Sequence, residues 1–113
     1  MEELYIDEQE ALKRVGGSKK LYIRLLKKYL EDSLLQNLEG SLALGDMKNA
    51  QLVAHSIKGV AANLSLTKLY YEATKVDAML KNDFVDPYVL QEFKAIFEKT
   101  NSAIEGYLNS EDT

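Results

Sequence analysis

Apolar side chains recur at spacings of three and four residues through most of this chain. The longest such stripe runs from Leu21 to Leu42, and others occupy residues 50–64, 66–80 and 89–104. This spacing places apolar residues on one face of an α-helix, whereas a half-buried strand would alternate. One proline and six glycines are too few for an all-β domain built on many turns. The sequence therefore predicts an all-α fold.

Residues that start and stop helices divide these stripes. Asp7 is placed to cap a short helix that Gly16-Gly17 would end, and Ser18 is placed to cap the next. Gly45-Asp46 and Asp86-Pro87 mark two further boundaries. We therefore expect short loops at each of these positions.

The sequence between Lys19 and Leu44 is compatible with either one helix or two. One long helix satisfies the apolar spacing, but a break near Asp32-Ser33 is equally compatible with the sequence. Both of these side chains compete for backbone hydrogen bonds and weaken a helix interior.

Four long amphipathic helices joined by short loops bury their apolar faces best in an antiparallel up-and-down four-helix bundle. The short N-terminal helix would lie across one end of it. A chain of 113 residues is the size of one domain, so residues 1–113 are predicted to form a single domain. We expect it to be a monomer.

The composition excludes several classes of site. There is no cysteine and only one histidine, so disulfide scaffolds, thiolate zinc sites and cysteine catalysis are excluded, and a metal- or haem-binding bundle is poorly supported. No apolar run approaches 18 residues, and the N-terminus lacks the features of a signal peptide. The sequence predicts a soluble, cytoplasmic protein that does not insert into membranes.

The single histidine, His55, is predicted to face solvent. At 100° per residue it lies about 160° around its helix from Ile57, the centre of the apolar stripe. A neutral imidazole is a nucleophile that can accept a phosphoryl group. No carboxylate lies at helical spacing from His55, which argues against an autonomous acid–base enzyme.

Two neighbours of His55 suit the same chemistry. Lys58, three residues on, can place an ammonium group near a transferred phosphoryl group. Gly59, four residues on, costs helix stability, but it leaves room beside the imidazole. The alternatives are an incidental surface histidine, a solvated lysine and a glycine that packs closely against a neighbouring helix.

The segment Ala54-His55-Ser56-Ile57-Lys58-Gly59-Val60-Ala61-Ala62-Asn63-Leu64 resembles the signature of histidine-containing phosphotransfer (Hpt) domains. Upstream, Ile6-Asp7, Gly16-Gly17 and Gly45-Asp46 are also similar to the family. The resemblance spans about Ile6 to Leu80. Val60 departs from it where a smaller residue is preferred, and Ser65 departs where a glycine is common.

The resemblance implies that His55 is the phosphorylated residue, that Lys58 stabilises the phosphate and that Gly59 gives clearance for a partner. It implies a phosphorelay intermediate in two-component signalling, without kinase activity of its own. Its partners would be response-regulator receiver domains and a hybrid sensor histidine kinase. The receiver would supply Mg²⁺, and this chain would need no cofactor; no nucleotide-binding motif is visible.

The charge is distributed unevenly. Residues 11–30 carry seven basic residues and no acidic one, whereas the rest of the chain has a net charge of −11. Such a segment is usually the solvated face of a helix, but it can also steer an acidic partner. The competing function is therefore a non-catalytic interaction module whose basic second helix docks an acidic partner. We predict no binding of nucleic acid in the phosphorelay reading.

Overall fold

The computed structural model describes residues 4–111, and within that range the chain forms six α-helices and no strand. This confirms the predicted all-α fold. The helices are α1 (Glu8–Arg14), α2 (Lys19–Glu31), α3 (Leu34–Ala43), α4 (Met47–Asn63), α5 (Thr67–Lys81) and α6 (Pro87–Glu111).

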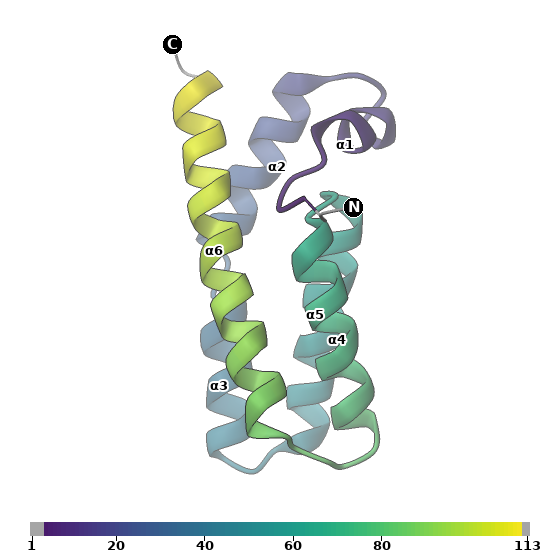
Figure 1. Cartoon of the computed structure of the whole chain (residues 1–113), viewed down its shortest axis with the longest axis vertical. Helices are drawn as coiled ribbons and strands as arrows, with labels where there is room; N and C mark the ends of the chain where they lie inside the picture. Colours follow the sequence, from purple (N-terminus) through teal and green to yellow (C-terminus); the bar gives the residue numbers. More distant parts are fainter. Residues whose placement is uncertain (1–3, 112–113) are drawn as a thin grey trace.

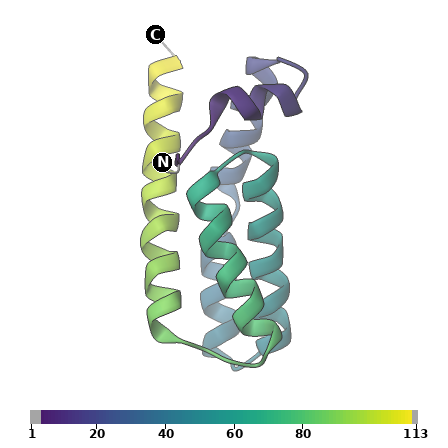
Figure 2. The ribbon, with the colours of Figure 1, turned by 45° about the vertical axis from the view of Figure 1, so that its right-hand side comes forward.

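Consecutive long segments run in alternate directions (Figure 1). The chain descends through α2 and α3, ascends through α4, descends through α5 and ascends again through α6. The short helix α1 lies across the upper end of this bundle, and Figure 2 shows the same arrangement from another side. None of the helices in the described range is long and apolar enough to cross a membrane.

The segment between Lys19 and Leu44 forms two helices, with the break at Asp32-Ser33 that the sequence allowed as one of two alternatives. Asp32 adopts an extended backbone (φ −73°, ψ 138°) after α2 ends at Glu31. Its amide still donates to the carbonyls of Lys28 and Tyr29. The helix restarts at Leu34, so α2 and α3 together fill the position of one long helix.

The predicted caps form at the other boundaries. The side chains of Asp7, Ser18 and Asp46 accept hydrogen bonds from the amides of Glu10, Leu21 and Asn49, respectively. At the start of α6, the Asp86 carboxylate accepts from the Tyr88 amide at 2.9 Å. These bonds satisfy amides that have no partner inside their helices.

The core lies between α2, α4, α5 and α6. Its largest fully buried apolar side chains include Tyr22, Leu26, Ile57, Leu69, Phe93 and Ile104. Helix α4 contributes mostly small residues, because Ala50, Ala54 and Ala61 are all fully buried. The Tyr22 hydroxyl donates to the Leu64 carbonyl at 2.7 Å and links α2 to the end of α4.

Polar contacts hold α1 against the end of the bundle. The Tyr107 hydroxyl of α6 donates to the Glu8 carboxylate, and Lys19 Nζ lies 3.6 Å from Glu8 Oε2 and 2.9 Å from Glu111 Oε1. The Asp7 amide donates to the Ser65 carbonyl in the α4–α5 turn. The N-terminal segment is thereby tied to both α4–α5 and α6.

Candidate functional site

Helix α4 presents His55 to solvent. His55 lies eight residues from each end of the helix, and its side chain is 60% exposed. Ile57, on the other side of α4, is fully buried. The helical periodicity thus placed the imidazole on the correct face.

A buried carboxylate from the next helix lies beneath the imidazole. The side chain of Asp77, on α5, is only 2% exposed. Asp77 Oδ2 lies 3.3 Å from His55 Nδ1, and Asp77 Oδ1 accepts a hydrogen bond from Gln51 Nε2 at 2.7 Å. Gln51 precedes His55 by one helical turn, so two consecutive turns of α4 face this carboxylate.

Two lysines complete the surroundings of Asp77. Lys58 Nζ lies 3.8 Å from Asp77 Oδ2, and Lys81 Nζ lies 3.5 Å from the same oxygen. Burial alone would raise the pKa of the Asp77 carboxyl, but hydrogen bonds from Gln51 and His55 and the charge of Lys81 hold that pKa below its ordinary value. Asp77 is therefore an ionised carboxylate at neutral pH.

This contact decides which imidazole nitrogen is free. An ionised carboxylate only accepts hydrogen bonds, so we assign the proton of the neutral ring to Nδ1. Nε2 then carries the free lone pair, on a side chain that is mostly exposed. The arrangement can orient a nucleophilic nitrogen and can stabilise positive charge that develops on the ring.

The structure brings Lys58 and Gly59 to the same region as His55. The Lys58 ammonium is directed toward Asp77, within 3.8 Å of its carboxylate. Gly59 is exposed, and a Cβ built on it would meet no heavy atom within 4 Å beyond its own helix backbone and its neighbours. Close packing against another helix therefore does not explain this glycine.

Sequence reasoning missed Asp77 and Lys81, and it identified Gln51 only as a helical neighbour of His55, without a role. Helical spacing from His55 identifies neighbours only on its own helix, whereas the carboxylate comes from α5. One signal was present: Asp77 stands directly after Val76 within the apolar stripe that contains Ala73 and Leu80. A charged residue beside a buried stripe is a candidate for a buried, paired group.

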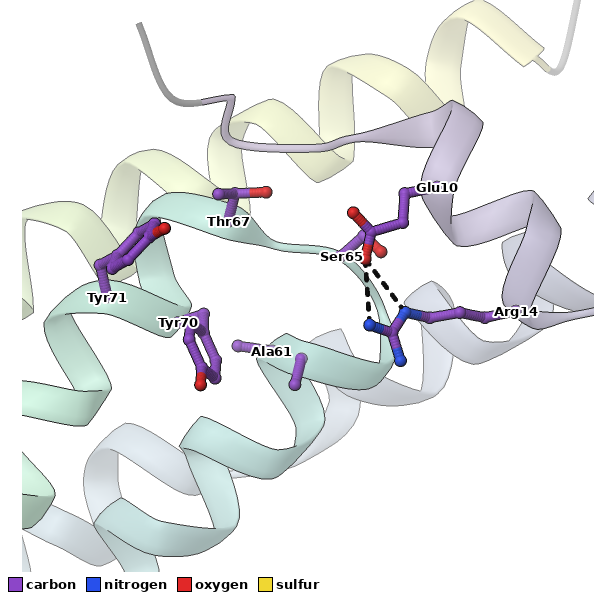
Figure 3. Close-up of a pocket in the computed structure, with 8 residues that line it drawn as sticks. Glu10, Arg14, Ala61, Ser65, Thr67, Tyr70 and Tyr71 are labelled. Atoms are coloured by element: carbon purple, nitrogen blue, oxygen red, sulfur yellow. Dashed lines mark hydrogen bonds and ion pairs between the residues drawn. The ribbon is translucent and has the colours of Figure 1, made fainter. Parts of the chain in front are cut away.

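A pocket of about 290 Å³ lies further along α4, where α1 crosses the α4–α5 turn (Figure 3). Arg14 and Glu10 form an ion pair at its rim, with Arg14 Nη2 3.0 Å from Glu10 Oε1. Ser65 also lines the pocket and adopts a left-handed backbone (φ 54°). His55 is not among the residues that line this pocket, so the imidazole site is a surface and not this cavity.

Comparison with known proteins identifies one family. Residues 24–103, which include all of α4, α5 and their contacts, match the family model of the Hpt domain. Neither the curated proteins nor the solved structures gave a significant match. Because the family model extends over most of the chain, the protein belongs to the Hpt domain family, whose members carry phosphoryl groups on histidine in two-component signalling.

Proposed function

We propose that His55 is the phosphoacceptor of a phosphorelay and exchanges its phosphoryl group with aspartates of receiver domains. One observation carries the proposal: the exposed imidazole has its Nδ1 3.3 Å from the buried Asp77 carboxylate. With Nδ1 engaged, Nε2 is the nitrogen available to a partner that approaches from solvent.

The chemical step is a displacement at phosphorus. The Nε2 lone pair attacks the phosphorus atom of an aspartyl phosphate; the N–P bond forms as the P–O bond breaks, and the electron pair leaves with the aspartate carboxylate. The ring gains positive charge while its proton stays on Nδ1. The ionised Asp77 stabilises that charge, so the residue positions His55 and lowers the barrier electrostatically.

Lys58 and Gly59 have supporting roles in this proposal. Lys58 and His55 both lie near Asp77 Oδ2, and Lys58 would exchange this contact for the phosphoryl oxygens. Gly59 leaves open space one turn beyond the imidazole, which a closely docked partner requires.

The partners follow from the family and the chemistry. Hpt domains interact with response-regulator receivers and with sensor kinases, and they generally lack kinase activity of their own. We propose that a hybrid sensor histidine kinase feeds this relay, that Mg²⁺ is held by the receiver and that this chain uses no cofactor. We further propose that it acts as a monomer in the cytoplasm, where the His55 face stays accessible to successive partners.

The test is label transfer from purified receiver domains that have been phosphorylated on aspartate with radiolabelled acetyl phosphate. Label should move to the wild-type protein through a bond that is acid-labile and base-stable, as expected for a phosphoramidate. His55→Gln should accept none and should keep the helical circular dichroism spectrum of the wild type. Equal labelling of His55→Gln would refute the assignment.

A further inference from the structure

The basic segment of the sequence forms an exposed strip on α2. Lys20, Arg24, Lys27 and Lys28 follow one another at spacings of four, three and one residues, which puts them on a single face of the helix. All four are exposed, and none has an ion-pair partner within 4.0 Å among residues 4–111. We call these four residues the basic strip.

The strip destabilises its own helix. Arg24 has a like charge four residues before it, three after it and four after it, and like charges at these spacings repel each other and weaken a helix. Nearby basic residues avoid this situation: Arg14 pairs with Glu10, and Lys19 pairs with Glu8 and Glu111. Glu31 and Asp32 follow the strip in sequence, but neither forms an ion pair with it within 4.0 Å in the described range.

A groove connects the strip to the His55 face. It has a volume of about 290 Å³ and lies between α2 and α4. Its lining includes Leu25 and Lys28 of α2, Asp32 directly after that helix, and Val60 and Asn63 of α4. At 100° per residue, Gly59 and Asn63 lie about 40° and 80° around α4 from His55, on the side that faces this groove. The strip, the groove and the open space at Gly59 therefore form one continuous surface.

The two sides of His55 differ in charge. Toward α5, the ammonium groups of Lys58 and Lys81 face the Asp77 carboxylate and are partly neutralised by it. Toward α2, none of the four cations of the strip forms an ion pair within 4.0 Å in the described part of the chain. An anionic partner is therefore attracted most strongly to the α2 side.

We propose that the α2 strip and the α2–α4 groove are the docking surface for the acidic face that surrounds the aspartyl phosphate of a receiver domain. This inference rests on the proposed function, because it names the side from which the phosphoryl donor reaches His55. An aspartyl phosphate and the carboxylates around it are compact and anionic, which matches a strip of four cations. A long polyanion such as DNA would also meet the part of the chain outside residues 11–30, whose net charge is −11.

The test compares charge reversals of equal size. Lys28→Glu and Arg24→Glu change the strip, and Lys99→Glu makes the same change in charge on an exposed site of α6 that has no ion-pair partner in the described range. We expect the association rate constant with a receiver to fall about tenfold for each strip variant at low salt, and the loss to shrink at high salt. Lys99→Glu should stay within about twofold of the wild type. Equal losses for Lys28→Glu and Lys99→Glu would overturn the inference.

Binding is measured in the His55→Gln background so that docking and transfer are separated. The His55→Gln protein keeps the strip but cannot accept label, so a failure of phosphotransfer and a failure of docking give different results. Parallel measurements use a DNA duplex and vesicles that contain anionic lipid. The proposed partner would also be wrong if the strip variants weakened binding to DNA or to vesicles but left binding to every phosphorylated receiver unchanged.

Discussion

At the scale of single residues, the proposed function depends on Asp77, which would make the exposed His55 a directed nucleophile. A surface imidazole in water exchanges its proton between two nitrogens and rotates freely. Here the buried carboxylate 3.3 Å from Nδ1 favours one tautomer and one ring orientation. Gln51 in turn fixes the carboxylate through its 2.7 Å hydrogen bond.

Asp77→Asn therefore tests the positioning role. Asparagine keeps the size of the side chain, but it removes the charge and can donate a hydrogen bond to Nδ1, which would move the ring proton to Nε2. We expect the first-order transfer rate at saturating receiver to fall about tenfold or more, which corresponds to loss of one charge-assisted hydrogen bond. Binding of the receiver should change little. Nitrogen-15 NMR of the imidazole should show the altered tautomer, a result that a purely structural role would not give.

Lys58→Ala probes a different contribution. The lysine is expected to stabilise added phosphoryl charge by about 1 kcal/mol, or several-fold in rate, because the site is solvent-exposed. Phosphohistidine lifetime and transfer rate are the measurements, with Lys99→Ala on α6 as the control. Unchanged kinetics for Lys58→Ala would leave this lysine a role only as a partner of Asp77.

At the scale of elements, Gly59 lowers the stability of helix α4, because it lies in the interior of the helix. Glycine costs a helix about 0.5–1 kcal/mol relative to alanine. A side chain has open space at this position and also at Gly106, in the interior of α6. These two glycines form a matched pair, because only Gly59 neighbours His55.

Gly59→Gln and Gly106→Gln should therefore both keep or raise the melting temperature. Transfer to His55 should fall at least tenfold for Gly59→Gln, because its side chain obstructs the docked receiver, and should be unchanged for Gly106→Gln. Thermal melts and transfer rates measured on the two variants test this prediction. Normal transfer by Gly59→Gln would remove the proposed clearance role.

The α4–α5 turn contains a second local cost. Ser65 is left-handed, and its buried hydroxyl has no hydrogen-bond partner among the described residues. Ser65→Gly removes both penalties, so we expect stabilisation of about 1 kcal/mol in urea unfolding. Asp83→Gly is the control, because Asp83 is also left-handed (φ 52°) but is exposed. A smaller gain for Ser65→Gly than for Asp83→Gly would contradict this account of the hydroxyl.

The elements themselves could largely be predicted from sequence, because they depend on local signals. Ser18, Asp46 and Pro87 each start a helix where the sequence placed one. The break at Asp32-Ser33 could not be decided, since one helix and two helices bury the same apolar stripe. Asp77 lay beyond prediction for another reason: its role arises only when α5 packs beside α4, 22 residues away in the chain.

At the scale of the whole molecule, Asp77 couples folding to pH. Its pKa is lower in the folded protein than the ordinary value of about 3.9, so its ionisation stabilises the fold above that value. The contribution is lost as the pH falls from about 3.9 through the lower pKa of the folded state. The free energy of unfolding of the wild type should thus fall more steeply below about pH 4 than that of Asp77→Asn. Urea titrations at several pH values test this, and parallel curves would contradict it.

The position of His55 at the midpoint of α4 has a consequence for how long a phosphoryl group would stay on the proposed acceptor. Sites that hold phosphate tightly use main-chain amides at a helix N-terminus or in a glycine-rich loop. Around His55 those amides are already donated to carbonyls one turn earlier in the same helix. Only side chains and the docked partner remain to stabilise the phosphoryl group. A histidine at this position suits a protein that passes its phosphoryl group onward, since the backbone offers the phosphate no hydrogen bonds.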